Sequence, residues 1–465
     1  MMMPKSNHLT IGIVGAGTAG LACAIALARL GHAVTVFEKH ASLRPLGAGL
    51  LIQPQGIAAL EALGVGAAFH AASVPVTRLL GTCHRDWTLV DIPYDEFEAR
   101  GVSRAALSQV LLDAALALGV RIRYGAAVDR ITVEGERATV HGADAASFGL
   151  VVIADGAAST LPAQVGLAVA STVYTWGALW AMFDVADWSG QALLEQRYHG
   201  TRRMFGLMPT ARVGGRLRLS MFWSLPCADY AAWQARAIEE WKGELRALWP
   251  QAAPVIDQIT RHDQFALATY RHARAKRLAH GPVCVIGDAA HSMSPQLGLG
   301  STLAVQDALA LANAVAAHGA LAGAAAYSDE RLCAVRNYQM LSKALTPCFQ
   351  AAGNGLWRDL VFALGLKLPG IQRLMYRSIA APAQALKNHS LRTPWGRCGG
   401  SEVAALVRPR NDYILRRYCP PTSNRAVVIW PSEQTRTASI SFSNTLSLSI
   451  AACCSAARAA GASAA

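Results

Sequence analysis

One short segment constrains the fold of this 465-residue chain more than any other. The apolar run Ile11–Val14 leads into a glycine-rich turn, then helical spacing through Leu30, and then a second β-branched run, Ala33–Glu38. A glycine-rich turn between a parallel strand and a helix is typical of a Rossmann-type α/β sheet. The turn consists of Gly15, Ala16, Gly17, Thr18, Ala19 and Gly20.

Each glycine of this turn has its own steric role. Gly15 permits the tight turn, Gly17 allows the backbone to approach a pyrophosphate, and Gly20 allows the helix to pack closely on the strand. The free amides and the positive dipole end of the helix favour phosphate groups. Glu38 stands 18 residues after Gly20, where its carboxylate can accept hydrogen bonds from ribose hydroxyls. The segment therefore predicts a dinucleotide site, and the acidic residue argues against a 2′-phosphate on the ligand.

Two further glycine–aspartate motifs each follow an apolar strand. Asp155–Gly156 comes directly after the run Leu150–Ala154. Gly287–Asp288 comes directly after the run Val283–Ile286. A carboxylate at the end of a parallel strand is well placed to hold a ribose or ribityl hydroxyl. After the second motif, a helix is expected to begin near Ser301, and its N-terminal amides would favour negative charge there.

Composition and charge exclude several classes of protein. With 52% hydrophobic and 16% charged residues, the chain is typical of a well-packed soluble α/β enzyme. The net charge of +13 comes from scattered Arg and Lys, so we expect no nucleic-acid partner. The ten cysteines form no C-x-x-C pair, which predicts no metal site. The apolar run of residues 302–327 holds too many polar residues for a membrane span, and without a signal peptide we expect a cytoplasmic protein.

The distribution of tryptophans and of strand-like segments divides the chain into two domains. Seven of the 11 Trp fall in residues 165–275, together with strand-like segments and one amphipathic helix expected over residues 231–249. A hairpin is expected over Thr77–Ile92, with its turn at His84–Asp86. We assign to the first domain, with its C-terminal helices, residues 8–75, 101–164 and 276–385. A second, inserted domain would hold the substrate and comprise residues 76–100 and 165–275, and residues 388–465 are expected to form a poorly ordered tail.

The three motifs, in this order and spacing, resemble those of group A flavoprotein monooxygenases, the FAD-dependent aromatic hydroxylases of the para-hydroxybenzoate hydroxylase type. The resemblance spans roughly residues 11–376. It implies an α/β fold in which a Rossmann-type FAD-binding domain carries an inserted mixed-sheet substrate domain. FAD would be bound noncovalently. The implied FAD-binding residues are Gly15, Ala16, Gly17, Thr18, Ala19, Gly20, Glu38, Lys39, Arg44, Gly49, Arg104, Asp155, Gly156, Gly287, Asp288, Pro295, Gly298, Leu299, Gly300, Ser301 and Thr302.

The resemblance also implies a reaction. NAD(P)H would visit transiently and reduce the flavin, O₂ would add at its C4a atom, and the hydroperoxyflavin would transfer one oxygen atom to an aromatic or other electron-rich small molecule. No side-chain nucleophile is required. His199, Tyr270 and His291 are candidates for a base that ionises a phenol, and each could equally be a structural polar residue.

The tryptophans of the inserted domain suggest a pocket wall. Trp176, Trp180 and Trp223 are candidates to line the chamber above the flavin ring. The possible polar anchors are Arg203, His199 and Tyr270. Each indole could instead fill the core of the domain.

Two positions depart from the family pattern. Pro162 stands where the family usually has Arg, which bears on the use of reduced nicotinamide rather than on flavin binding. Thr302 stands where the family usually has Asn and can still donate a hydrogen bond. Two alternatives therefore stay open: an FAD-dependent reductase of an isoprenoid-like substrate, and an inactive flavin-binding module. The sequence names neither the substrate, nor the choice of NADH or NADPH, nor the oligomeric state.

Overall fold

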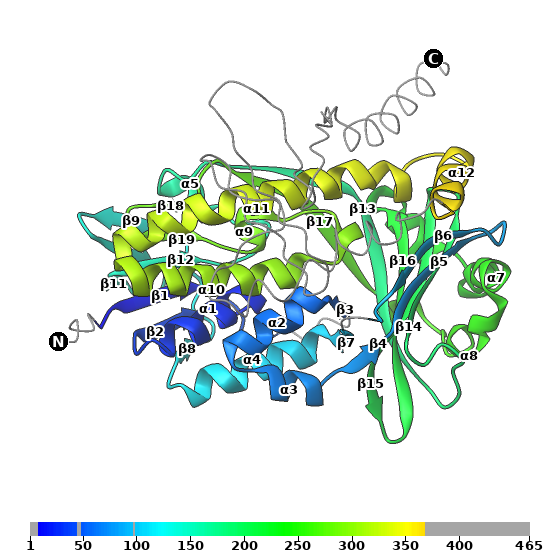
Figure 1. The fold of residues 1–465 in the computed structure, drawn as a ribbon, viewed down its shortest axis with the longest axis horizontal. Helices are drawn as coiled ribbons and strands as arrows, with labels where there is room; N and C mark the ends of the chain where they lie inside the picture. The colour runs from blue at the N-terminus through cyan, green and yellow to red at the C-terminus, as the bar shows by residue number, and fades with distance from the viewer. Residues whose placement is uncertain (1–7, 44–47, 96–97, 368–465) are drawn as a thin grey trace, which may run out of the picture. The chain divides into compact units, whose positions relative to one another are not determined.

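The computed structural model describes residues 8–43, 48–95 and 98–367 (Figure 1). By internal contacts the chain divides into residues 1–395 and 396–465, and all described residues belong to the first unit. The expected FAD-binding residue Arg44 and the expected tail, residues 388–465, lie outside the described residues.

The glycine-rich turn belongs to a six-stranded sheet with the order β18-β19-β12-β1-β2-β8. Neighbouring strands are parallel except β18 and β19, which pair antiparallel. The central strands are apolar along nearly their whole length because both faces of the sheet are covered. The strands are β1 (Thr10–Val14), β2 (Ala33–Phe37), β8 (Arg121–Arg123), β12 (Leu150–Ile153), β18 (Ala279–His280) and β19 (Val283–Val285).

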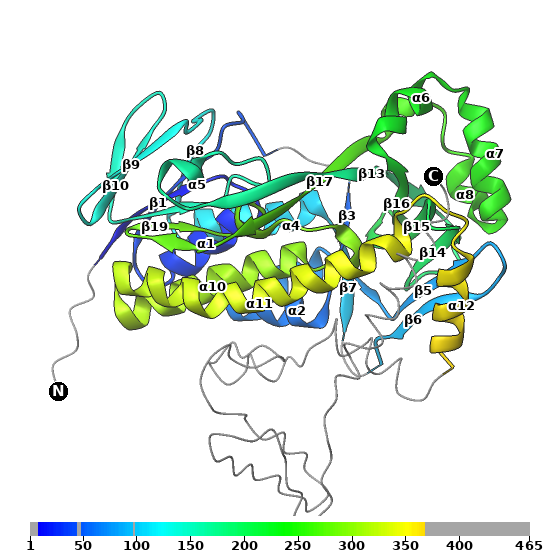
Figure 2. The ribbon, with the colours of Figure 1, turned by 90° about the horizontal axis from the view of Figure 1, so that it is seen from above.

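Helices cover one face of this sheet. Helix α1 (Thr18–Ala28) packs against α10 (Gly300–His318), and α10 packs against α11 (Ala320–Phe349). Figure 2 shows α10 and α11 side by side along the sheet. Among the described residues, no helix is long and apolar enough to cross a membrane. The smaller helices of this region are α2 (Pro54–Leu63), α3 (Gly66–Ala71) and α4 (Arg104–Ala117).

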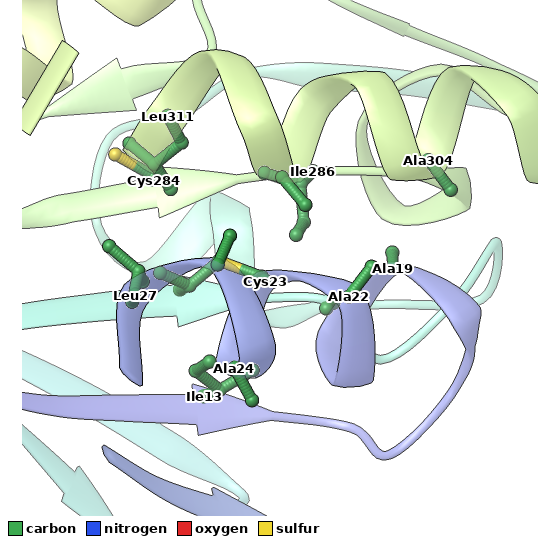
Figure 3. Close-up of a cluster of buried hydrophobic side chains, with 14 of the residues drawn as sticks. Ile13, Ala19, Ala22, Cys23, Ala24, Leu27, Cys284, Ile286, Ala304 and Leu311 are labelled. Atoms are coloured by element: carbon green, nitrogen blue, oxygen red, sulfur yellow. The ribbon is translucent and has the colours of Figure 1, made fainter. Parts of the chain in front are cut away.

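Small side chains allow α1 to approach its neighbours closely. Figure 3 shows Ala22 and Cys23 of α1 pointing toward Ile286, which follows β19, and toward Leu311 of α10. All four side chains are at most 4% exposed. This buried cluster holds the start of α1 against the segment that leads into Gly287. Packing therefore brings the glycine-rich turn and the Gly287–Asp288 motif together.

An antiparallel three-stranded sheet covers the other face. It consists of β9 (Arg130–Glu134), β10 (Arg137–His141) and β11 (Ala146–Phe148) in the order β11-β10-β9. A Cβ built on Gly12 of β1 would lie only 2.7 Å from the ring of Phe148, so the absence of a side chain there lets the two sheets pack closely.

A second, seven-stranded sheet has the order β17-β13-β16-β15-β14-β5-β6. It is mixed, because β14 pairs parallel with β5 and all other pairs are antiparallel. The hairpin of β5 and β6 turns at the expected residues, with Asp86 at φ 59°. The predicted architecture, a Rossmann-type sheet with a mixed sheet inserted, is confirmed. The strands are β5 (Arg78–Cys83), β6 (Thr88–Pro93), β13 (Val169–Val185), β14 (Leu193–His199), β15 (Arg203–Val213), β16 (Arg216–Pro226) and β17 (Ala266–Ala275).

Tryptophans fill the core between the seven-stranded sheet and the short helices α6 (Tyr230–Ala235), α7 (Ile238–Leu248) and α8 (Ala253–Ile256). The prediction of one helix over residues 231–249 was wrong. Arg236 is extended, with φ −79° and ψ 149°, and ends α6. Its guanidinium pairs with carboxylates in α7, at 2.7 Å from each of Glu240 and Glu244, so a charge cluster bridges the break.

Two glycines bring the sheets into contact through the small sheet β3-β7-β4, which consists of β3 (Gly49–Ile52), β4 (Val74–Val76) and β7 (Ala99–Ser103). A Cβ on Gly101 would lie 1.9 Å from the Pro209 carbonyl oxygen of β15. The Gly49 amide donates to Ser220 Oγ of β16 at 2.9 Å. Only glycine allows the backbones to approach this closely.

Candidate cofactor and substrate site

The three motifs lie at one edge of the six-stranded sheet. Gly15 follows β1, Glu38 follows β2, Asp155 follows β12 and Gly287 follows β19, and these four strands are direct parallel neighbours. Because carboxyl ends of parallel strands meet at the same edge, segments far apart in sequence converge there.

The glycines of the first turn meet different surroundings. Gly15 has φ +103°, which favours glycine, and its amide donates to the Phe37 carbonyl at 2.8 Å. A Cβ on Gly20 would lie 1.9 Å from the Gly15 carbonyl oxygen. At Gly17, the N-cap of α1, a Cβ would have no atom within 4 Å. Gly20 is therefore required by packing, whereas Gly17 leaves open space at the helix N-terminus.

Glu38 ties the end of β2 to the turn. It is 9% exposed, and its Oε2 accepts from the Ala16 amide and its Oε1 from the His40 amide, both at 3.0 Å. An ionised carboxylate offers about four acceptor positions, so two amides leave capacity for hydroxyl donors.

Asp155 has a buried carboxylate oxygen, Oδ1, with no hydrogen-bond partner among the described residues. Burial raises the pKa of Asp155, and the nearby Ser159 hydroxyl, the Asp155 backbone amide and the charge of Lys39 only partly oppose this shift. Lys39 itself is exposed. A buried acceptor without a donor costs about 1–3 kcal/mol, so this oxygen fits a site where a bound molecule supplies the donor.

A buried charge network fixes the turn that carries Asp288. Asp307 of α10 is fully buried, and its Oδ2 accepts from the Gly287 amide at 3.0 Å and lies 2.5 Å from His291 Nε2. Its Oδ1 accepts from Arg331 Nε at 2.8 Å. Asp288 itself is exposed at the start of the short helix α9 (Asp288–His291).

Burial alone would raise the pKa of Asp307, but the charges of His291 and Arg331 and the hydrogen bonds from His291 and Gly287 lower it to about 2. Neither Asp307 nor Arg331 is among the site residues predicted from the sequence. The available signal was a carboxylate within an apolar helix, which is rarely buried without a partner. His291, a candidate base, is 3% exposed and held in this network.

Helix α10 begins shortly after the Gly287–Asp288 motif. Gly298 has φ +63°, and a Cβ on Gly298 or Gly300 would meet no atom within 4 Å. The Thr302 hydroxyl is buried with no hydrogen-bond partner in the described ranges. A Cβ on Gly56 of α2 would lie 2.4 Å from Thr302 Oγ1, so α2 encloses that hydroxyl. The remaining residues predicted here are Pro295 and Leu299, in the turn before the helix, and Ser301 in its first turn.

Arg104 begins α4, and Tyr270 lies in β17 of the seven-stranded sheet. Ser103 caps α4 by accepting from the Ala106 amide at 3.1 Å, which leaves Arg104 exposed at the helix start. Burial raises the pKa of Tyr270, while a 3.4 Å hydrogen bond from Trp180 Nε1 and the nearby charge of Arg104 oppose the shift. Tyr270 therefore contacts Trp180 and is close enough to Arg104 to feel its charge.

A second polar cluster adjoins Tyr270. Tyr174 lies with its ring centroid 6.5 Å from that of Tyr270, and its hydroxyl donates to Gln350 Oε1. Gln296 Nε2 donates to the same oxygen at 2.5 Å, and Gln296 Oε1 is buried without a partner among the described residues. This cluster was not predicted from the sequence, because its members come from three distant segments.

The other candidates lie elsewhere. His199 is exposed and faces His84, with ring centroids 4.4 Å apart, and it lines a different cavity together with Arg203. Trp223 belongs to the tryptophan-rich core, and Trp176 is 8% exposed. Pro162 is buried in the short helix α5 (Leu161–Gln164).

The comparisons with known proteins agree with this geometry. The sequence model of the family described as "FAD binding domain" matches residues 8–340. A probable 2-heptyl-3-hydroxy-4(1H)-quinolone synthase, AqdB2 of Rhodococcus erythropolis, is 29% identical over 322 residues, covering 65% of this chain and 78% of that protein. The phenazine 1,6-dicarboxylic acid hydroxylase PhzS of Lysobacter antibioticus is 28% identical over 345 residues, covering 67% and 83%.

A solved structure has the same fold. The FAD complex of a Klebsiella pneumoniae HpxO variant matches with a TM-score of 0.68 at 22% identity, covering 80% of this chain and 98% of that chain. The family match includes the three motifs and both sheets. This chain therefore belongs to the FAD-binding-domain family, and within it is an FAD-dependent monooxygenase of the aromatic hydroxylase type.

Proposed function

We propose that FAD lies noncovalently along the carboxyl edge of the six-stranded sheet and serves the oxygenation of an aromatic small molecule. The observation that carries this proposal is the convergence of three motifs around buried, unpartnered polar atoms, Asp155 Oδ1 and Thr302 Oγ1. When bound, the flavin supplies the electron transfer that lets one atom of O₂ enter the substrate.

The residues present fit this cofactor. The open space at Gly17 allows a pyrophosphate to approach the amides at the start of α1. Glu38 retains acceptor capacity for ribose hydroxyls, and exposed Asp288 is free to hold a ribityl hydroxyl. None of these contacts requires a covalent bond.

The substrate would be a flat aromatic molecule held beside Tyr270 and Trp180. Relatives named for a quinolone and a phenazine favour a nitrogen-containing fused ring. Of the three candidate bases, Tyr270 is the one that lies beside Trp180, because His291 is bound within the Asp307 network and His199 lines a cavity away from the motifs. Since burial raises the pKa of Tyr270, its hydroxyl stays protonated and would orient a substrate hydroxyl by hydrogen bonding rather than remove its proton. Trp180 is the indole best placed for the pocket wall, because its ring nitrogen meets the Tyr270 hydroxyl.

The proposal includes NAD(P)H as a transient donor and a cytoplasmic location, where reduced nicotinamide is generated. It assigns residues 8–75, 101–164 and 276–385 to the FAD-binding domain, and residues 76–100 and 165–275 to the substrate domain. The strand bounds support this division, because every strand of the seven-stranded sheet falls in the latter two segments.

The test is purification of the full chain followed by acid or heat release of its flavin. We expect free FAD, and substrate-stimulated oxidation of NAD(P)H with matching O₂ consumption across a panel of aromatic heterocycles. A reductase would oxidise NAD(P)H without consuming O₂, and a binding module would do neither. A colourless, folded preparation that FAD cannot reconstitute would contradict the cofactor proposal.

A further inference from the structure

A cavity of about 360 Å³ lies at one end of the seven-stranded sheet, apart from the three motifs. Its lining includes the side chains of His84, Arg85, His199, Arg202 and Arg203. No residue of the glycine turn or of the aspartate motifs contributes to it. We propose that this cavity is a binding site for a small anion that carries phosphate or carboxylate groups.

The wall of the cavity is held by a buried ion pair. Arg358 and Asp359 of α12 (Leu356–Gly365) are both 0% exposed and pair at 2.7 Å. Arg358 also donates to the carbonyls of Gly200 at 2.6 Å and Cys348 at 2.9 Å. The second oxygen of Asp359 accepts from Arg85 at 2.7 Å. Burying such an ion pair costs desolvation free energy. Here the pair connects α12 to Arg85, Gly200 and Cys348 and so fixes the wall of the cavity.

The cavity arginines keep donors for a ligand. A guanidinium has five N–H donors, and each arginine here uses few of them on a carboxylate. Arg202 meets Asp229 at 3.2 Å, and both side chains are about half exposed, so this pair contributes little. Arg203 lies 3.4 Å from Glu244, a carboxylate that also pairs with Arg236 at 2.7 Å.

Two imidazoles complete the lining. The His84 and His199 rings lie 4.4 Å apart, and neither makes a hydrogen bond to another side chain in the part of the chain that the structure describes. Burial and the charges of Arg85 and His199 lower the pKa of His84, although Asp359 and the Tyr198 carbonyl oppose them. A positive environment of this kind attracts an anion.

A metal ion is the rival occupant, because Cys83, His84 and Asp359 place ligand atoms within 4.8 Å of one another. Both Asp359 oxygens, however, already accept from arginines. A cation would have to displace one guanidinium and lie beside another, which is electrostatically unfavourable. The arrangement of charges therefore favours an anion.

The experiment uses the full-length, FAD-loaded protein, so that the motif edge is occupied. Inorganic pyrophosphate and citrate are titrated separately by calorimetry. We expect one saturable site for at least one of them; pyrophosphate alone would assign phosphate chemistry, and citrate alone would assign carboxylate chemistry. The double variant R202Q/R203Q should weaken binding at least tenfold.

The matched control is R212Q/R216Q, which removes the same charge from exposed positions at the opposite end of β15 and β16. It should change the affinity by less than twofold. Arg85→Gln serves as a second cavity variant, and retained flavin absorbance reports folding in each case. No saturable binding, equal weakening in both double variants, or stoichiometric zinc uptake lost in His84→Ala would overturn the proposal.

Discussion

Gly17 and Gly20, three residues apart in one turn, show how position decides the role of a residue. Gly20 has no room for a methyl group, because the Gly15 carbonyl oxygen would be 1.9 Å away. Gly17 has room, since nothing described lies within 4 Å. Gly20 therefore serves the fold, whereas Gly17 leaves space that a ligand can use.

The matched variants Gly17→Ala and Gly20→Ala should therefore differ. Gly20→Ala should lower the free energy of unfolding by about 1–3 kcal/mol or more, because backbone must shift. Gly17→Ala should leave apoprotein stability within about 0.5 kcal/mol but weaken FAD binding, since the methyl group occupies the approach to the amides. Thermal unfolding of apoprotein and FAD titration measure the two effects. Equal FAD affinity in Gly17→Ala and wild type would contradict the placement of the pyrophosphate.

Asp307 supplies a prediction with a pH dependence. Asp307→Asn leaves Arg331 and His291 without their buried counter-charge, and should cost about 3–5 kcal/mol of stability at neutral pH. The native pKa of Asp307 is about 2, below the ordinary value of 3.8, so folding favours the ionised form. The free energy of unfolding of the wild type should therefore exceed that of Asp307→Asn above pH 4, and this difference should be lost as the pH falls toward 2.

Denaturant unfolding of both proteins across that pH range measures this loss. Asp113→Asn is the control, because Asp113 is exposed on α4 and accepts only from Gln109 in the described part. A pH-independent difference between Asp307→Asn and wild type would show that the carboxylate charge is not what stabilises the turn.

At the scale of elements, one contact between the small sheet and the seven-stranded sheet is made by backbone against backbone. Gly101 of β7 lies against the Pro209 carbonyl of β15. Gly101→Ala should force the small sheet away from the seven-stranded sheet and cost about 1–3 kcal/mol. Gly243→Ala in α7 is the control, since its Cβ would meet nothing within 4 Å and alanine favours a helix by up to about 1 kcal/mol. Thermal melts that rank the two variants in the opposite order would contradict this account.

Local sequence patterns predicted the helices, strands and turns, whereas pairs of residues far apart in the sequence could not be predicted from them. The turn at Gly15 and the hairpin at His84–Asp86 depend on backbone requirements that adjacent residues reveal. The break at Arg236 was missed, because apolar periodicity continues across it and only the pairing with Glu244 marks it. The Asp307 network was missed for a similar reason, since its partners lie in separate helices that pack only in the folded chain.

At the scale of the whole molecule, all the proposed FAD-binding residues lie well before the end of the chain. The family match ends at residue 340, and every proposed FAD-binding residue precedes residue 303. A chain truncated after Lys387 should therefore retain FAD with an affinity within about twofold of the full chain. Fluorescence titration of both proteins with FAD provides the comparison. Loss of FAD from the shorter chain would place part of the site after Lys387.

The insertion of one sheet into another has a consequence for synthesis on the ribosome. Strand β12 ends at Ile153, but its outer neighbour β19 begins only at Val283. At 5–20 residues per second, the intervening stretch of about 130 residues takes roughly 6–26 s to translate. Throughout that interval the apolar edge Leu150–Ile153 has no strand to pair with, and unpaired edges of this kind promote association between chains. Expression yield should therefore depend on how fast this stretch is translated and on chaperone supply, even where the finished protein is stable.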